Sequence, residues 1–272
     1  MTAATAPSSR VRWAGLAGRP HGNEDAGGRS FVFLHGLTFD HRMWEPVLQA
    51  LPESHRAIAF DLPGHGATPA LTTRGLEPVV EAVHEAVVAA ELDAPIVVGH
   101  SIGGSLATIY AASYDAAAVV SVDAPLRFEP FAELLLSLAP QLRGDGFGEA
   151  WSRFRAGMHA ARLSAATRAL LSAGDDASQD VVLAYQADLL ENPLDEVVRR
   201  RDEGVERLRM EHTPYLALYA NPIDASERAW LFDRLPQAEL VVWPVGHHFP
   251  HLDQPIRFSD LLTGLAAGLP LR

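Results

Sequence analysis

The stretch Val98-Gly-His-Ser-Ile-Gly-Gly104 places Ser101 at the centre of a G-x-S-x-G pattern. The apolar run 94–99 reads as a short buried strand, and residues 102–114 read as a helix. A turn this tight between strand and helix crowds out a Cβ atom at the two glycines of the pattern and exposes the serine Oγ at the end of the strand. The free N–H groups of the helix N-terminus then point at any anion that forms there. The stretch therefore predicts a nucleophile elbow with Ser101 as the nucleophile.

Two other segments carry residues that suit partners for such a serine. The apolar run Phe31-Val-Phe-Leu continues into His35-Gly-Leu37, and Trp243-Pro-Val-Gly-His-His-Phe-Pro-His-Leu-Asp-Gln-Pro255 follows a strand-like run at 239–243. In these motifs and in their order, the chain resembles the α/β-hydrolase superfamily over residues 31–124 and 213–270. The resemblance implies a Ser-His-Asp triad, an oxyanion hole and a fold of strands alternating with helices.

The resemblance also implies which backbone groups bind the oxyanion. In such a site two N–H groups donate to the same oxyanion. One belongs to Leu37, after the first of these strands, and the other to Ile102, directly after the nucleophile. His35 is then expected to brace the loop that carries Leu37 through hydrogen bonds.

The catalytic histidine has two candidates, because the superfamily's loop commonly reads Gly-His-Phe-x-x-Leu-Glu/Asp-x-x-Pro. The Gly-His pair favours His247, whereas His-Phe-x-x-Leu-Asp-x-Pro fits residues 248–255 without a gap. We prefer His248, since Leu252 and Pro255 fix the loop more firmly than one glycine. A metal site built from these neighbouring histidines is not expected, because adjacent side chains point apart.

The acid also has two candidates. Most superfamily members carry it after the seventh strand, where this chain reads Leu218-Tyr-Ala-Asn-Pro-Ile-Asp224, without the usual glycine and with the aspartate one residue late. A minority carry it after the sixth strand, and Asp123 ends the run 116–123, 22 residues beyond Ser101. We prefer Asp123 to Asp224.

Strands and helices alternate along most of the chain, which predicts an α/β fold with a mostly parallel sheet flanked by helices. Residues 11–15 read as the first strand and 21–29 as a polar turn. Residues 125–212 contain helical patterns without a convincing strand, so we expect a helical cap inserted between core segments 1–124 and 213–272. The basic run 199–201 reads as a solvated helix face.

Composition limits the classes of function. The 272 residues are 48% hydrophobic, include no cysteine and carry a formal net charge of −12. Zero cysteines exclude disulfides and a thiol nucleophile. The negative charge disfavours nucleic acid and anionic membranes as partners. The sequence contains no run of eighteen apolar residues, and its first residues lack the features of a signal peptide, so we expect a cytoplasmic enzyme.

These observations together predict a serine hydrolase that needs no cofactor and no metal and cleaves a small carboxylic ester or lactone through an acyl-enzyme. Two alternatives stay open, because a fold does not decide a function. One is an enzyme that uses the same triad for carbon–carbon hydrolysis or for non-hydrolytic cyclisation. The other is a receptor that keeps the triad and binds a small ligand. The sequence leaves the substrate and the oligomeric state open.

Overall fold

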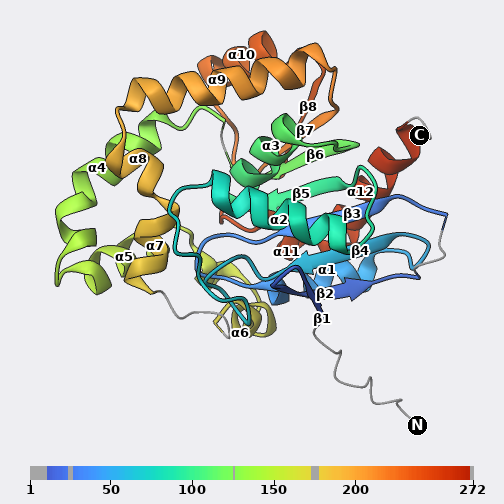
Figure 1. The fold of residues 1–272 in the computed structure, drawn as a ribbon, viewed down its shortest axis with the longest axis horizontal. Helices are drawn as coiled ribbons and strands as arrows, with labels where there is room; N and C mark the ends of the chain where they lie inside the picture. Colours follow the sequence, from blue (N-terminus) through green and yellow to red (C-terminus); the bar gives the residue numbers. More distant parts are fainter. Residues whose placement is uncertain (1–10, 24–26, 125, 173–177, 270–272) are drawn as a thin grey trace.

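The computed structural model describes residues 11–23, 27–124, 126–172 and 178–269 (Figure 1). Its centre is an eight-stranded sheet in the order β1-β2-β4-β3-β5-β6-β7-β8. The strands are β1 (Val11–Trp13), β2 (Leu16–His21), β3 (Ser30–Leu34), β4 (Arg56–Phe60), β5 (Ile96–His100), β6 (Ala118–Val122), β7 (Tyr215–Tyr219) and β8 (Ala238–Val242). β2 is antiparallel to both β1 and β4, and all the other pairs are parallel. The expected α/β fold with a mostly parallel sheet is confirmed.

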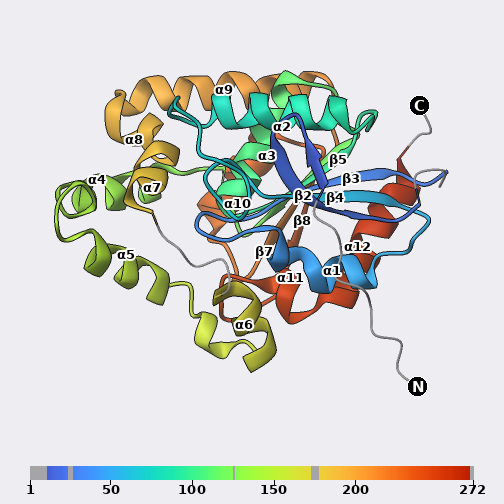
Figure 2. The ribbon, with the colours of Figure 1, turned by 60° about the horizontal axis from the view of Figure 1, so that its bottom comes forward.

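Helices cover both faces of this sheet (Figures 1 and 2). They are α1 (Glu45–Ala50), α2 (Glu77–Ala89), α3 (Ile102–Ser113), α4 (Glu129–Arg143), α5 (Phe147–Ala156), α6 (Ala165–Ser172), α7 (Gln179–Tyr185), α8 (Ala187–Glu191), α9 (Leu194–Met210), α10 (Ala225–Arg234), α11 (Pro250–Asp253) and α12 (Pro255–Gly268), with the 3₁₀ helices η1 (His41–Trp44) and η2 (Ala160–Arg162). α2, α3, α9 and α10 lie on one face, and α1, α11 and α12 lie on the other.

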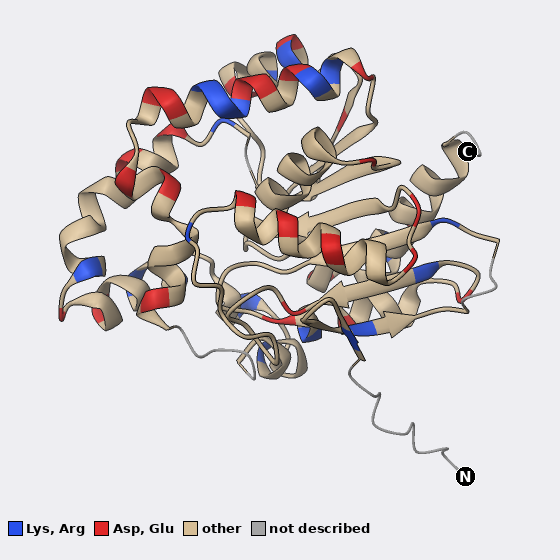
Figure 3. Cartoon of the chain, in the orientation of Figure 1, with Lys and Arg blue, Asp and Glu red and all other residues tan. Residues whose placement is uncertain are grey.

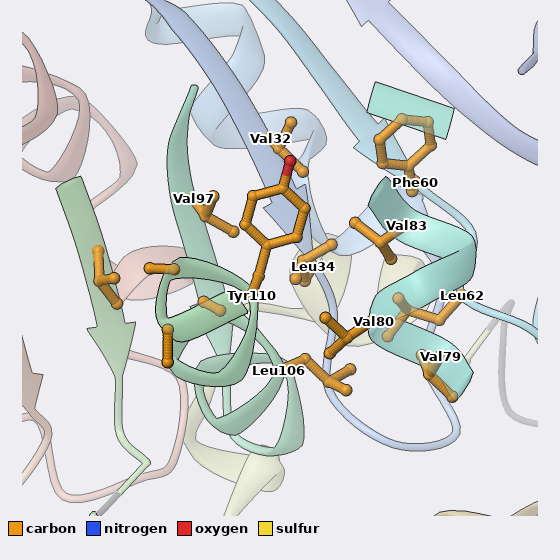
Figure 4. Close-up of a cluster of buried hydrophobic side chains, with 14 of the residues drawn as sticks. Val32, Leu34, Phe60, Leu62, Val79, Val80, Val83, Val97, Leu106 and Tyr110 are labelled. Atoms are coloured by element: carbon orange, nitrogen blue, oxygen red, sulfur yellow. The ribbon is translucent and has the colours of Figure 1, made fainter. Parts of the chain in front are cut away.

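Side-chain alternation along the central strands builds a separate core on each face. In β3, Val32 and Leu34 pack with α2 and α3, whereas Phe31 and Phe33 pack with α1 and α12. Tyr110 of α3 lies among the strand and helix side chains of the first cluster (Figure 4). Fully burying a side chain of this kind contributes about 1.5–3 kcal/mol, so the two clusters hold the strand ends at fixed positions.

The amino-terminal part of the sheet differs from the expectation. The first strand ends at Trp13, and the segment Leu16–His21 forms a second strand that the sequence reading missed. Gly18 and Pro20 weaken a strand pattern when they are judged locally. This segment is a strand because it pairs with β4. The two backbones lie so close together that a Cβ atom at Gly18 would lie 2.9 Å from the Ala59 carbonyl oxygen.

The described residues between 126 and 212 form helices and no strand. α4, α5, α7 and α8 lie beside the sheet, α6 packs against η1, and α9 runs along α3 (Figure 2). Gly204 of α9 faces α3 closely, since a Cβ atom there would lie 3.4 Å from the Ala112 Cβ. The division into core and cap stays a prediction. Within the described ranges, no helix has the length and apolar character needed to cross a membrane.

Candidate active site

Five parallel strands, β3, β5, β6, β7 and β8, end at the same edge of the sheet, and each is followed by a residue or loop singled out in the sequence. Ligands of open α/β sheets bind outside this edge. The geometry there begins with Ser101, which lies between β5 and α3 with φ 55° and ψ −123°. Its N–H donates to the Val122 carbonyl at 2.9 Å. A non-glycine residue at positive φ is strained, as expected for a nucleophile elbow.

The glycines around Ser101 allow the elbow to form. A Cβ atom at Gly99 would lie 1.9 Å from the Gly103 carbonyl oxygen. A Cβ atom at Gly103 would lie 2.3 Å from the Leu34 carbonyl oxygen, so α3 starts against the end of β3. The serine and the loop after β3 are therefore held next to each other by backbone packing.

The loop after β3 leaves the Leu37 N–H free. The next two N–H groups are engaged: Thr38 donates to His65 Nε2 at 3.0 Å and Phe39 to the Gly36 carbonyl at 3.1 Å. No hydrogen bond joins the Leu37 N–H to any described residue. Ile102 is the first residue of α3, so its N–H has no acceptor within the helix. Both groups are free to bind an oxyanion.

His35 braces this loop in the way the sequence led us to expect. Its Nε2 accepts the Leu62 N–H at 2.9 Å, so its Nδ1 carries the proton and donates to the Gly36 carbonyl at 2.8 Å. Complete burial lowers the pKa of His35 and keeps the ring neutral.

His248 and Asp123 meet at the carboxyl edge of the sheet. The Nδ1–H of His248 donates to Asp123 Oδ2 at 2.6 Å. The other carboxylate oxygen of Asp123 accepts the Ala220 N–H at 2.8 Å, which ties the end of β6 to the end of β7. The His248 ring also contacts the ring of His100, the residue before Ser101, with centroids 4.5 Å apart. The two preferred partners are thus bonded to each other beside the residue that precedes Ser101, and no hydrogen bond joins the Ser101 hydroxyl to His248 among the described residues.

The alternative histidine, His247, is engaged by contacts within the protein. His247 is buried, its Nδ1 accepts the Phe249 N–H at 3.2 Å, and its Nε2 lies 3.3 Å from Asp253. Both ring nitrogens therefore have partners, one in the loop that follows β8 and one at the end of α11.

The alternative acid, Asp224, lies at the N-terminus of α10. Its carboxylate accepts the Glu227 N–H at 2.8 Å and the Ser226 hydroxyl at 2.7 Å, as a helix N-cap does. The hydrogen bond from the Glu227 N–H is the main cause that lowers the pKa of Asp224. No hydrogen bond joins it to His247 or His248.

His100 is a residue whose contact the sequence did not predict. Its Nε2–H donates to the His248 carbonyl at 2.8 Å, and its Nδ1 has no partner among the described residues. His251 packs beside it, with ring centroids 4.8 Å apart. Burial and the neighbouring histidines lower the pKa of His100 well below its usual value. Its position directly before Ser101 is the only feature of the sequence that could have indicated a contact with His248.

A second histidine–carboxylate pair joins the segments that follow β3 and β4. Asp40, His41 and Asp61 are buried, with their ligand atoms within 4.8 Å of one another, the one such group among the described residues. Asp61 accepts hydrogen bonds from the His41 ring at 2.6 Å, from its N–H and from Ala67, whereas Asp40 pairs with Arg42. Burial alone would raise the pKa of Asp61, but the hydrogen bonds from His41 and Ala67, together with the charge of His41, hold the pKa far below the usual value. The hydrogen-bonding groups of these residues are thus paired with neighbouring protein groups, as in a network that stabilises structure.

A cavity of about 280 Å³ adjoins the elbow. It reaches Ile102 and Ser105 but not Ser101 or His248, and it extends between α3 and the helices α4, α7, α8 and α9. Its apolar wall consists of Leu76, Ile102, Ile109, Leu126, Phe128, Phe131, Leu189, Val197 and Val205. The volume lies just below the range of about 300–1,000 Å³ that is usual for ligand pockets. Charged residues such as Glu77, Asp188 and Arg200 also line the cavity, so it suits a small, mainly apolar group.

The basic run 199–201 corrects one sequence interpretation. Basic and acidic residues are interspersed along α9 (Figure 3). Arg199 pairs with Glu203, and both side chains are exposed, as expected for a solvated face. Arg201 does not: it is mostly buried, binds Glu129 at 3.0 Å and stacks over the Trp230 ring. The periodicity of α9 could not reveal that α4 and α10 would cover this side of the helix.

A mostly parallel eight-stranded sheet with a strained serine between strand and helix defines an α/β protein of the nucleophile-elbow type. A model of the Alpha/beta hydrolase family matches residues 31–261, which is most of the chain. The protein therefore belongs to the alpha/beta hydrolase family.

Known proteins place the chain within this fold without fixing its activity. A 2-succinyl-6-hydroxy-2,4-cyclohexadiene-1-carboxylate synthase of Enterobacter sp. (strain 638) is 33% identical over 85 residues, which are 31% of this chain and only 33% of that protein. AqDC, which recognises and cleaves the ring of the Pseudomonas quinolone signal, has a TM-score of 0.77 at 19% identity over 96% of this chain and 99% of its own. A thermophilic esterase from Thermogutta terrifontis has a TM-score of 0.74 at 20% identity over 95% and 99%. At these identities the solved structures show the fold alone.

Proposed function

We propose that the protein is a serine hydrolase that cleaves a small carboxylic ester or lactone. The observation that carries the proposal is the 2.6 Å hydrogen bond between His248 Nδ1 and Asp123, together with a serine strained at φ 55° whose preceding residue, His100, contacts the His248 ring. A histidine held in this tautomer presents Nε2 as a base. The likeness in fold to an esterase agrees with this reaction class.

In the proposed mechanism His248 takes the proton of the Ser101 hydroxyl while Oγ bonds to the substrate carbonyl carbon. The carbonyl oxygen becomes an oxyanion that accepts hydrogen bonds from the N–H groups of Leu37 and Ile102, each typically worth about 3–4 kcal/mol in the transition state. The C–O bond then breaks, and His248 returns its proton to the leaving alkoxide. A water molecule, deprotonated by His248, then attacks the acyl carbon; the bond from this carbon to Oγ breaks, His248 returns the proton to Oγ, and the carboxylic acid leaves. Asp123 stabilises the imidazolium in both steps.

The cavity beside Ile102 supports a small substrate with an apolar part. It begins at the residue that donates to the oxyanion, so an acyl group bonded to Ser101 has apolar space next to it. The cap helices that wall this cavity would keep bulk water away from the acyl group.

A second candidate function is carbon–carbon chemistry on the same triad, either hydrolysis or cyclisation. It is favoured by the partial match to a synthase and by the likeness in fold to a ring-cleaving protein. A receptor that keeps the triad remains a third possibility from the sequence.

Turnover and covalent labelling test the proposal. We expect steady turnover of p-nitrophenyl acetate with a burst of nitrophenol, and attachment of one fluorophosphonate per chain at Ser101, located by peptide mass spectrometry. Ser101→Ala should remove both while the circular dichroism spectrum stays unchanged. Stoichiometric labelling without turnover would favour the receptor. Near wild-type turnover by Ser101→Ala would refute the assignment of the nucleophile.

A further inference from the structure

The loop that carries His248 is held from outside by only a few hydrogen bonds. We define the histidine loop as residues 244–249, between β8 and α11. The N–H of His248 donates to the Met158 carbonyl at 3.0 Å, and the Gly246 carbonyl accepts from Arg162 Nη1 at 2.7 Å. Both partners belong to the predicted cap, although the loop follows the last strand of the sheet.

The two partners lie in one short segment, residues 157–163, between α5 and α6; we name it the clamp segment. Leu163 is buried in the same apolar cluster as Trp44 and Phe249. His159 adopts φ 53°, a left-handed conformation that turns the chain between the two hydrogen-bonding residues. The clamp segment is therefore packed on the core beside the histidine loop.

Gly246 allows the arginine to approach. It adopts φ 72°, and a Cβ atom there would lie 2.3 Å from Arg162 Nη1. A side chain at this position would thus be strained in its backbone and would also push the guanidinium away.

The peptide groups of His248 are fixed on two sides. Met158 accepts from its N–H, and His100, adjacent to the nucleophile, donates to its carbonyl. The ring of His248 is in turn bonded to Asp123. The core thus holds one side of the residue and the clamp segment holds the other.

We infer that the clamp segment positions the catalytic base, with Arg162 as a positioning residue that acts through the Gly246 carbonyl. This inference rests on the proposed function of His248. Arg162 acts through its hydrogen bond to the Gly246 carbonyl and not on the reacting atoms themselves. Its loss removes one of the two hydrogen bonds between the clamp segment and the histidine loop, and a displacement of about 1 Å in a catalytic group can lower the rate about 100-fold.

The first test compares arginine variants of the full chain. We expect Arg162→Ala to lower kcat on p-nitrophenyl acetate, and the rate of fluorophosphonate attachment to Ser101, by about 10- to 100-fold with KM within about twofold. Arg162→Lys should recover part of the loss, because an ammonium also donates to a carbonyl. The matched control is Arg153→Ala on α5, whose exposed side chain pairs with Glu149, at 2.6 Å, and with no other described residue, and which should behave as wild type.

If Arg162→Ala does not fold, Arg162→Met replaces it, because it keeps the aliphatic stem and donates no hydrogen bond. A folded variant with wild-type kcat and wild-type labelling would overturn the inference and leave the proposed function intact. A wild-type protein that neither turns over the ester nor reacts with fluorophosphonate would refute the proposed function and the inference together.

A double-mutant cycle separates positioning from general damage. Gly246→Ala should lower kcat strongly in the wild-type background and less in the Arg162→Ala background, because its Cβ atom then displaces no guanidinium. Multiplicative losses in kcat would show that Gly246 and Arg162 act independently, which contradicts the inference.

Discussion

The Nδ1 of His248 and the Oδ2 of Asp123 lie 2.6 Å apart although 125 residues separate them in the chain. Asp123 is itself held at φ 48°, and its second oxygen accepts the Ala220 N–H of the neighbouring strand end. The carboxylate therefore has little freedom to turn away from the histidine. A fixed acid of this kind orients the imidazole before substrate binds, which costs no reorganisation during the reaction.

This relationship predicts how two aspartates differ. Asp123→Asn should lower kcat by about 10³–10⁴-fold, because the amide can present an N–H to His248 and favour the wrong tautomer. Asp224→Asn is the matched control and should keep both activity and thermal stability, since asparagine also caps helices. Steady-state kinetics and thermal unfolding of the two variants decide between the aspartates. A larger loss of kcat in the Asp224 variant would reverse the assignment.

The two adjacent histidines should separate activity from stability. His248→Ala should abolish most turnover with a small change in the midpoint of thermal unfolding. His247→Ala should lower that midpoint more, because it empties a buried site and leaves the Phe249 N–H without its acceptor. Equal losses of kcat/KM in the two folded variants would argue against His248 as the base.

Two helical glycines make a matched pair for the elbow. Gly103→Ala should destabilise the protein by about 1–3 kcal/mol or prevent folding, because its Cβ atom would overlap the Leu34 carbonyl. Gly264→Ala in α12 meets no atom within 4 Å and should stabilise by about 0.5–1 kcal/mol. Guanidinium unfolding curves measure both changes. A well-folded, active Gly103→Ala protein would contradict the close packing of α3 on β3.

Buried neutral histidines should make stability depend on pH. Burial, with a smaller contribution from His35, lowers the pKa of His65 from its usual 6.5 to about 3. Between these values the unfolded chain binds a proton that the native protein does not, so stability falls as the pH falls from 6.5. Each such residue contributes a slope of about 1.4 kcal/mol per pH unit well inside this range. Unfolding free energies measured between pH 7.5 and 5 should show this decrease.

His65→Gln provides the control for this pH dependence. The glutamine oxygen can accept the Thr38 N–H that His65 accepts in the wild type, but it does not titrate. The variant should therefore show a flatter dependence of the unfolding free energy on pH. An unchanged slope would mean that His65 does not contribute to it.

The sequence by itself determined the α/β fold and the elbow, because both depend on short-range physics. The alternation of apolar runs with helical patterns specifies parallel strands and crossovers. The glycines around Ser101 are required by contacts that start within a few residues, as between Gly99 and Gly103. β2 escaped prediction because its pairing with β4, and not its own composition, makes it a strand.

Only the tertiary structure decided which side chains lie together at the carboxyl edge. Asp123 and Asp224 follow neighbouring parallel strands, so local sequence gives either of them a route to the same histidine. The loop conformation at φ 48° turns Asp123 toward His248, while the start of α10 engages Asp224 as a cap. In the same way, residues 157–163 do not predict the contact with Gly246, because Arg162 and Gly246 are 84 positions apart in the chain. Contacts between segments so far apart in the sequence depend on how helices and sheet pack together. The periodicity within one segment does not predict that packing.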